Sequence, residues 1–253
     1  MKKFIAFIFC GITFACIANA ETINIDWIVD DETYQQTTCN IGDDLILPAA
    51  PTKYGYTFQG WLAYTPIEYI ESTGTQYIDT GITDVVNSEF EIVFQLTKLS
   101  TTDGCIVGAD ANNGWKTIVG YNSSFFYTQC GGNGQYVSCN GSVDLEKHTM
   151  KVVNTTNTQT FICDNIAQTQ TYTIPVDQTY SLYIGARHKP NGARLFSDQR
   201  TYSFYVKKND TLVRDFIPVL DPNGVPCMYD RVTDTFFYNS GTGDFIAGPV
   251  IGE

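Results

Sequence analysis

The sequence has few basic residues. It holds 15 Lys and Arg against 27 Asp and Glu, which gives a formal net charge of −12. Proteins that bind nucleic acid neutralise phosphates with Lys and Arg, so this balance argues against nucleic acid and against anionic membrane surfaces as partners. A net charge of this size otherwise favours solubility.

Metal-binding patterns are also lacking. None of the 8 cysteines stands in a CxxC pair or near the only 2 histidines, His148 and His188, so the sequence predicts no zinc site. Asp103, Asp110 and Asn112 lie in a Gly-rich segment and have oxygen ligands of the kind that Ca²⁺ takes. Their spacing matches no calcium loop, and we predict no metal and no cofactor.

The cysteines that follow residue 20 are candidates for disulfides, because an exported chain meets oxidising conditions. Cys130 and Cys139 bracket the Gly-rich loop Gly131–Tyr136. A hairpin there would bring the two Cα atoms within disulfide range, and we predict that they bond. Cys39 is the only cysteine of its segment and is expected to be unpaired. The sequence leaves open the pairing of the others, Cys105, Cys163 and Cys227.

Helical periodicity is nearly absent beyond the first twenty residues. Apolar and polar side chains alternate instead in Glu89–Leu96, and the same period of two marks residues 180–184 and 202–206. Enrichment in Thr, Tyr, Phe and Val, with Asn, Gly and Asp between the runs, supports strands. The chain is therefore predicted to be all-β, with helix confined to the N-terminal twenty residues and one short turn at most.

The first twenty residues have the features of a secretory signal peptide. Lys2 and Lys3 precede the short apolar run Phe4–Ile17, and Ala18–Ala20 supplies small residues for cleavage after Ala20. Since the run is short for a bilayer span, we expect no transmembrane anchor and a secreted, periplasmic or cell-surface protein of a bacterium. Cleavage would remove two lysines and change the net charge from −12 to −14. A lipoprotein cleavage box ending at Cys16 is the less favoured alternative, because its aliphatic residue is missing.

A distinct small module is predicted for residues 21–63. The segment GDDLILPAAPTKYGYTFQGW, Gly42–Trp61, resembles the Listeria–Bacteroides repeat, a β-grasp-like module of bacterial surface proteins. The motif positions include Leu45, Leu47, Tyr56, Phe58 and Trp61. The aromatic residues would supply most of so small a core, and Trp61 is expected there rather than as a sugar platform.

The remainder, residues 66–253, carries two motifs that resemble a concanavalin A-like lectin/glucanase (LamG-like) domain. These are IEYIESTGTQYIDTGI at residues 67–82 and LVRDFIPVLDPNGVPCMYDRVTDTFFYNSGTGDF at residues 212–245. The resemblance implies a two-sheet antiparallel jelly-roll β-sandwich whose first and last strands lie together. The near-repeat of Tyr-Ile-acid would form its opening hairpin, and Arg214 and Asp215 would anchor the closing strand.

The resemblance also includes glucanases, whose catalytic acids stand at i, i+2 and i+4 of one strand face. Here Glu89 and Glu91 share a face, but Val93 takes the third position. A retaining glycosidase needs two carboxyl groups about 5 Å apart with unequal pKa values. Neither histidine has a nucleophile at a recognisable spacing, although a triad can form in space alone. We therefore expect no enzyme.

Glycan binding is the favoured function. Lectin-type sites stack an aromatic face on a sugar ring and fix its hydroxyls with polar side chains. Six loop residues offer these groups: Trp115, Tyr121, Tyr127, Tyr136, Arg187 and Asn191. The alternative is a structural module that contacts surface proteins and binds no small ligand, and a glycoside hydrolase is the third choice.

Overall fold

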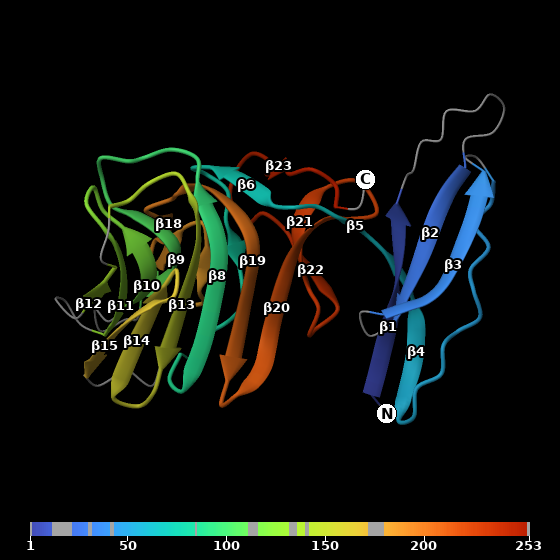
Figure 1. Cartoon of the computed structure of the whole chain (residues 1–253), viewed down its shortest axis with the longest axis horizontal. Helices are drawn as coiled ribbons and strands as arrows, with labels where there is room; N and C mark the ends of the chain where they lie inside the picture. The colour runs from blue at the N-terminus through green and yellow to red at the C-terminus, as the bar shows by residue number, and fades with distance from the viewer. Residues whose placement is uncertain are drawn as a thin grey trace. The chain divides into compact units, whose positions relative to one another are not determined.

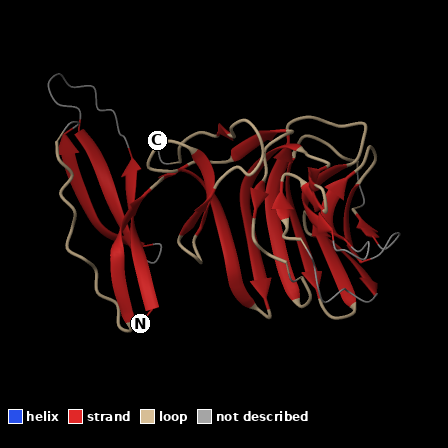
Figure 2. Cartoon of the chain, turned by 180° about the vertical axis from the view of Figure 1, so that it is seen from behind, coloured by secondary structure: helices blue, strands red, loops and turns tan. Residues whose placement is uncertain are grey.

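The computed structural model describes residues 2–11, 22–29, 32–40, 43–83, 85–110, 116–131, 136–139, 142–171 and 180–251. Every regular element in these ranges is a β-strand (Figure 2), which confirms the all-β prediction. The chain divides into two compact units. The first comprises Met1–Glu68, Val219–Val225 and Pro249–Glu253, and the second comprises Tyr69–Pro218 and Pro226–Gly248.

The first unit contains a four-stranded sheet. Its strand order is β3 (Glu32–Asn40), β2 (Thr22–Val29), β1 (Lys2–Gly11) and β4 (Tyr56–Ala63) (Figure 1). β1 runs antiparallel to β2 and parallel to β4. Among the side chains that the structure describes in this unit, Ile25 and Trp27 are buried in its core, and Cys39 and Trp61 pack against them. Trp61 meets Trp27 edge-on at 4.8 Å between ring centroids, so it packs in the core as expected.

Residues 2–11 differ from the expectation for a leader. The helix foreseen there is absent, because Lys2–Gly11 forms strand β1 in the uncleaved chain. Its backbone pairs with Gly11 opposite Asn24 on β2 and with Lys2 opposite Tyr56 on β4. A short apolar run can form either a helix or a buried strand, and here β2 and β4 each offer it a strand to pair with. Cleavage after Ala20 stays a prediction.

The second unit is built from two sheets. The eight-stranded sheet has the order β12 (Tyr136–Ser138), β11 (Phe126–Gly131), β10 (Lys116–Tyr121), β9 (Gly104–Asp110), β16 (Tyr183–Ile184) and β7 (Ile78–Asp79). β17 (Arg187–Lys189) adds to β9, and β18 (Gly192–Arg194) adds to β17.

The eleven-stranded sheet has the order β15 (Ile166–Thr171), β14 (Thr158–Cys163), β13 (Lys147–Asn154), β8 (Ser88–Leu96), β19 (Asp198–Lys208), β20 (Thr211–Leu220), β21 (Pro226–Asp230) and β22 (Thr235–Phe237). β6 (Ile70–Thr73) pairs with β19 and with β23 (Ile246–Ala247), and β5 (Thr65–Pro66) pairs with the end of β20. The β-sandwich prediction is confirmed.

Cross-strand register decides which side chains of the eight-stranded sheet enter the core. Val107, Val119 and Ile184 lie in one row across β9, β10 and β16, and all three are buried. The adjacent row faces away from the other sheet and runs through Tyr136, Gln129, Ile118, Gly108, Tyr183 and Asp79. Side chains of a strand alternate between its faces, but Gln129, Ile118 and Tyr183 of this outer row are themselves buried, and Tyr136 at its end is exposed. The two sheets meet through contacts such as Phe94 on Phe126, with 5.8 Å between ring centroids.

The opening motif closes the sandwich, but not as a hairpin. β6 and β7 diverge to different sheets: β6 pairs with β19, and β7 pairs with β16. The expected hairpin is therefore wrong, because each half of the near-repeat finds its partner far along the chain. The meeting of first and last strands is confirmed, since Ile246 of β23 stands opposite Glu71 of β6.

Arg214 and Asp215 of the second motif anchor the closing strands, as expected. Asp215 Oδ2 accepts a bond of 2.7 Å from Arg231 Nη2, and Arg214 Nε lies 3.6 Å from Asp230 Oδ2. Each therefore pairs with a residue of β21 or the turn after it rather than with its neighbour.

The predicted disulfide between Cys130 and Cys139 is wrong. Cys139 bonds to Cys163, with 6.2 Å between the Cα atoms, and Cys130 is a buried free thiol 3.5 Å from Thr117 Oγ1. The hairpin forms, but its register pairs Gln129 with Tyr136, and Cys139 N donates to Phe126 O. Four residues of extended strand, about 13 Å, therefore separate Cys139 from the position beside Cys130. Cys39 is unpaired, as predicted.

Candidate functional site

A small cleft opens beside the free edge of the eight-stranded sheet. Its volume is about 260 Å³, and it is lined by Asp103, Asn122, Phe125, Tyr127, Gln129 and Tyr136. Three of these side chains are aromatic and three are polar. This pairing is the one expected of a surface that holds an amphipathic ligand.

Strand alternation and one turn place the aromatic rings. On β11, Phe126 and Thr128 point into the core, so Tyr127 and Gln129 point outward. Asn122 shapes the turn before β11, because its Oδ1 accepts hydrogen bonds from the backbone N of Ser124 (2.8 Å) and of Phe125 (3.0 Å). The turn leaves the Phe125 ring on the same side as Tyr127.

A glycine gives Tyr127 its place. A Cβ added at Gly120 on β10 would lie 3.3 Å from Tyr127 Cζ and 2.8 Å from the Gly104 carbonyl oxygen. The second contact is closer than real Cβ atoms approach backbone, so a larger residue would displace the strand or the ring. Because Gly120 has no side chain, the Tyr127 ring can pack directly against the backbone of β10.

The three rings form a cradle. Phe125 and Tyr136 lie nearly parallel, at 6.2 Å between centroids and 12° between planes. Tyr127 stands edge-on to both, at 6.3 Å from Phe125 and 6.4 Å from Tyr136. Tyr136 is 46% exposed, and its ring therefore offers an open face to a ligand.

Polar groups stand around this cradle. Burial, assisted by the charges of Cys105 and Asp103, raises the pKa of Tyr127 to about 12, so its hydroxyl remains a hydrogen-bond donor at neutral pH. Asp103 is exposed at the rim, where its carboxylate can accept hydrogen bonds from a ligand, and the amide of Asn122 also lines the cleft. No Lys or Arg is among the residues that line the cleft in the described part of the chain.

The structure sorts the six predicted glycan-binding residues. Tyr127 and Tyr136 are brought together in the cleft. Tyr121 is 2% exposed and packs in the core against Phe126, which corrects the prediction for that residue. The alternation of side chains along β10 explains the burial of Tyr121, because Tyr121 stands opposite the core residue Phe126.

The other three candidates are not in the cleft. Arg187 is buried and forms an ion pair with Asp110, so its guanidinium is already occupied. Asn191 is exposed in the turn between β17 and β18. Trp115 and Asn112 lie outside the described residues, and Trp115 stays a prediction. Sequence reasoning missed Phe125, Asp103 and Gln129, although the spacing of 125, 127 and 129 was a signal for one shared face.

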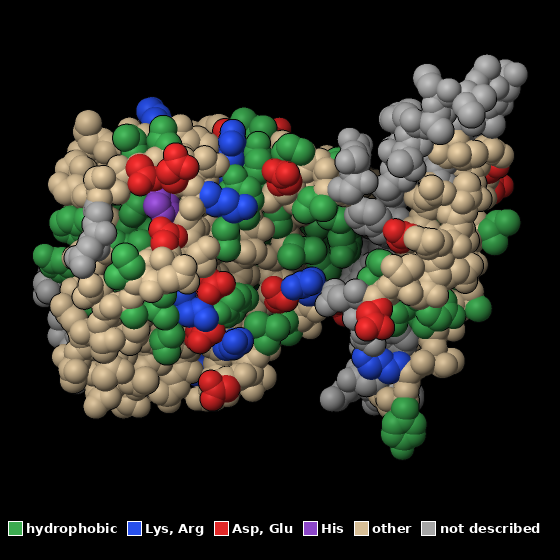
Figure 3. All heavy atoms as spheres, viewed as in Figure 1, with side chains coloured by type: hydrophobic (Ala, Val, Ile, Leu, Met, Phe, Trp, Pro, Cys, Tyr) green, Lys and Arg blue, Asp and Glu red, His purple; other side chains and the backbone are tan. Residues whose placement is uncertain are grey.

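The glucanase-like acids lie on the other sheet. Glu89 on β8 accepts bonds from Tyr205 Oη (2.7 Å) and Lys207 Nζ (3.2 Å), and Lys151 Nζ lies 3.2 Å from Glu89 and 3.5 Å from Glu91. Partial burial raises the pKa of Glu89, but these hydrogen bonds outweigh it and hold the pKa below its ordinary value. A general acid needs the opposite shift. Opposite charges are interspersed on the face of the second unit drawn in Figure 3.

His188 lies in a polar cluster with Ser181 and Asp79. Ser181 Oγ donates to Asp79 Oδ1 at 2.5 Å and lies 3.3 Å from His188 Nδ1, while His188 Nε2 is 3.1 Å from Tyr183 Oη. In a hydrolase triad the histidine stands between serine and acid, whereas here the serine stands between the other two. Among the described residues, no three His, Cys, Asp or Glu side chains form a metal-binding group.

His148 is held between two carboxylates. Its Nδ1 lies 2.6 Å from Asp164 Oδ2 and its Nε2 lies 2.9 Å from Asp144 Oδ1. Burial lowers the pKa of His148, but the two carboxylates outweigh it and raise the pKa above its ordinary value. We name this arrangement, Asp144–His148–Asp164, the histidine clasp. It lies beside the disulfide, since Asp164 follows Cys163 directly.

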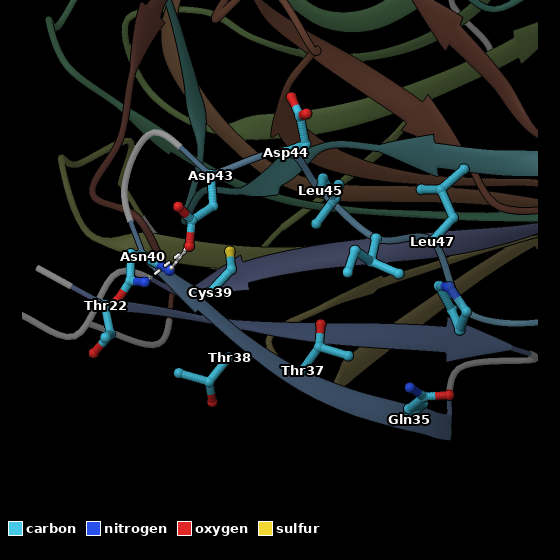
Figure 4. Close-up of a pocket in the computed structure, with 12 residues that line it drawn as sticks. Thr22, Gln35, Thr37, Thr38, Cys39, Asn40, Asp43, Asp44, Leu45 and Leu47 are labelled. Atoms are coloured by element: carbon cyan, nitrogen blue, oxygen red, sulfur yellow. Dashed lines mark hydrogen bonds between the residues drawn. The ribbon is translucent and has the colours of Figure 1, made fainter.

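The first unit contains a cavity with a volume of about 580 Å³. It separates β3 from the extended segment that follows it (Figure 4), where Asn40 Nδ2 donates to Asp43 Oδ2 at 2.8 Å. Leu45 and Leu47 border it and are 42% and 56% exposed. Apolar groups that remain this accessible suggest a contact surface rather than a polar ligand site.

Comparison with known proteins yields only structural likeness. No family model and no curated protein matches the sequence. A proposed carbohydrate-binding protein from Bacteroides ovatus is similar, with 9% identity and a TM-score of 0.51 over 93% of this chain and 70% of that chain. The heptameric SAP-like pentraxin of Limulus polyphemus has 11% identity and a TM-score of 0.47 over 74% of this chain and 95% of that chain. A mutant Trypanosoma rangeli sialidase with trans-sialidase activity has 8% identity and a TM-score of 0.40 over 50% of this chain and 21% of that chain. This chain thus spans about a fifth of the sialidase. No described helix has the length and apolar character to cross a bilayer. At these identities the likeness shows the fold alone, an antiparallel jelly-roll β-sandwich.

Proposed function

We propose that the second unit binds a glycan in the cleft formed by Phe125, Tyr127 and Tyr136. The observation that carries the proposal is the open face of Tyr136 beside two further rings, with polar side chains at the rim. The apolar face of a pyranose would stack on Tyr136. Its hydroxyls would bond to Asp103, Asn122 and the Tyr127 hydroxyl.

The charge of the cleft supports a neutral glycan. Asp103 is the charged side chain among the six that line it, and the whole chain carries −12. A uronic acid or sialic acid would therefore meet repulsion without a basic partner. A neutral hexose chain meets no such cost.

Binding without hydrolysis is the second part of the proposal. The paired Glu89 and Glu91 are held by Lys151, Lys207 and Tyr205, and their sheet does not form the aromatic cleft. With the predicted leader, the protein would act as a secreted or surface-displayed binder. Single shallow sites of this kind bind weakly and gain strength when several copies are displayed together.

The test compares retention of the protein on immobilised neutral glycans with retention of two tyrosine variants. Tyr136→Ala is expected to weaken binding about tenfold, which equals about 1.4 kcal/mol. Tyr238→Ala is the matched control, because Tyr238 is also 46% exposed but lies outside the cleft. Equal retention of both variants would refute the assigned cleft. Release of reducing sugar that Glu89→Gln abolishes would show a hydrolase instead.

A protein-contacting module is the second candidate, favoured by the apolar exposure of the first unit. Ile46 is 83% exposed, and Tyr54 is fully exposed. Exposed apolar groups gathered on one unit mark contact sites. If no glycan retains the protein, while Ile46→Asp abolishes its adhesion to cells of the producing bacterium, this candidate replaces the first.

A further inference from the structure

An inner strand of the sheet in the first unit comes from the predicted leader. β1 lies between β2 and β4 (Figure 1), antiparallel to β2 and parallel to β4. Among the described strands, β4 stands at the end of this sheet and has β1 as its neighbour. The place of β4 in the sheet therefore depends on β1.

Removal of the leader would open a gap in this sheet. Cleavage after Ala20, as the sequence predicts, takes β1 away and leaves what we call the strand slot between β2 and β4. Neighbouring strands lie about 4.8 Å apart, so the walls of the slot would stand about 10 Å apart, with room for one strand. Strand edges with unpaired N–H and C=O groups readily pair with another chain. The slot therefore suits an extended segment antiparallel to β2 and parallel to β4.

Aromatic packing holds the two walls of the strand slot in place. Trp27 of β2 is fully buried, and Trp61 of β4 meets it at 4.8 Å between ring centroids. Phe58, also on β4, packs edge-on against Trp61 at 5.4 Å. Movement of β4 by one strand width onto β2 would break up this close packing. An incoming strand preserves the packing, so strand addition is favoured over closure of the slot.

A carboxylate oxygen beside the slot has no partner. Asp26 Oδ1, on β2, is buried and has no hydrogen-bond partner among the described residues. Phe9 of β1 stands directly opposite Asp26, and a phenylalanine side chain has no donor to offer. Opposed residues of an antiparallel pair have Cβ atoms about 4.5–5.5 Å apart. A Lys or Arg at this position of an incoming strand would therefore reach the Asp26 carboxylate.

The register defines the chemistry of the segment that fits. Ile8 stands opposite Trp27 of the core, whereas Phe9 stands opposite Asp26. Opposed residues share a face of the sheet, so the segment needs apolar residues at alternate positions and a basic residue between them. Loss of the leader takes two lysines from the chain and changes its net charge from −12 to −14, which also favours a basic segment.

We propose that the first unit, once the leader is removed, binds an extended segment of a partner protein in the strand slot. The segment carries apolar residues at alternate positions and a Lys or Arg opposite Asp26. Main-chain hydrogen bonds to β2 and β4 supply affinity, and the side chains on the two faces supply specificity. The proposal rests on the predicted cleavage and does not depend on glycan binding by the second unit.

Peptide binding to the exported protein tests the proposal. The full chain is expressed in a bacterium that exports it, and mass spectrometry establishes the N-terminus of the product. The first peptide has the sequence Lys2–Gly11 with Cys10→Ala to prevent oxidation, and the second carries Phe9→Lys in addition. Fluorescence anisotropy is expected to show about tenfold tighter binding of the second peptide. Ile8→Pro in the second peptide should abolish binding, because an inner strand does not tolerate proline.

Two protein variants test the contact with Asp26. Asp26→Asn should remove the preference for the Phe9→Lys peptide. Asp44→Asn is the matched control, because it removes the same charge from an exposed position of the first unit, and it should retain the preference. Hydrogen exchange with the second peptide bound should show protection of backbone amides in β2 and β4, the strands that would pair with it.

Each other outcome overturns the inference. An exported protein that begins at Met1 would keep β1 in the sheet. If neither peptide binds, β2 and β4 close the slot without a partner. Equal affinity of the two peptides, or an unchanged preference in Asp26→Asn, would refute the assigned contact, and protection in the second unit alone would place the peptide elsewhere. Tyr136→Ala should leave peptide affinity unchanged, so failure of the cleft proposal and failure of this one are distinguishable.

Discussion

The histidine clasp predicts how the stability of the second unit depends on pH. The perturbation is His148→Gln, which removes the titratable ring but retains a side chain that can donate one hydrogen bond. In the native protein a protonated imidazole donates to Asp164 at 2.6 Å and to Asp144 at 2.9 Å. The ring also packs edge-on against Phe126, with 4.9 Å between ring centroids.

The pH window follows from the direction of two shifts. Because folding raises the pKa of His148, its contribution is complete below its unfolded pKa of about 6.5 and is lost as pH rises through the folded pKa. Partial burial raises the pKa of Asp144, but hydrogen bonds from Glu146 N and His148 lower it below its ordinary value. Its contribution is therefore present above about pH 4 and is lost as pH falls through the folded pKa. The clasp is strongest between these limits.

The magnitude can be worked from the contacts. A hydrogen bond to a charged group contributes about 1.5–3 kcal/mol. The Asp144 and Asp164 side chains are 46% and 44% exposed, so solvent screening reduces each bond to about 1 kcal/mol. The clasp then contributes about 2 kcal/mol, or about 4–8 °C in Tm for a unit of this size.

The assay is thermal unfolding followed by circular dichroism at several pH values. We expect His148→Gln to lower Tm by about 4–8 °C near pH 5.5 and by less as pH rises through the folded pKa of His148. Asp164→Asn should remove part of the same pH dependence, and the two substitutions should be less than additive because they break one bond. A Tm difference that is constant from acid to alkaline pH, or that grows with pH, would refute the reasoning.

Three further predictions concern stability. Cys139→Ser should cost about 3 kcal/mol by the loop-entropy relation, since the disulfide closes a sequence separation of 24 residues, and reduction should lower the native Tm to that of the variant. Gly104→Ala should lower the free energy of unfolding by about 3 kcal/mol, because the added Cβ would lie 2.2 Å from Tyr121 Cζ. Gly224→Ala has open space around it and should cost only the left-handed backbone penalty of about 1 kcal/mol. Urea unfolding of both variants measures the difference. Asp230→Ala should lower the free energy of unfolding by about 3 kcal/mol, because the buried Asp230 carboxylate accepts hydrogen bonds from Asp215 N (2.8 Å) and Thr233 Oγ1 (2.6 Å). A loss below about 1 kcal/mol in urea unfolding would show that these two bonds do not stabilise the fold.

Some features of the site were within reach of the sequence. The alternation that predicts a strand at Glu89–Leu96 agrees with β8. On β11 the same alternation puts Tyr127 on the face opposite Phe126. β9, by contrast, is buried on both faces along most of its length, so its polarity pattern does not show which side faces the core. Tyr121 was predicted to lie in a loop, whereas it is the last residue of strand β10 and is buried.

The sequence by itself determined the class of fold, the period-two strands and the two motifs that meet when the sandwich closes. The fold class and the strand pattern are local properties, because side-chain alternation and turn residues act within a few positions of the chain, whereas the meeting of the two motifs was implied by the family resemblance. Only the tertiary structure decided that Cys139 pairs with Cys163, that Phe125 and Tyr136 share one cleft, and that Asp144 and Asp164 hold His148. Each of these depends on the register of a strand or on the partner across the sandwich, and a shift of one residue would turn every side chain to the other face.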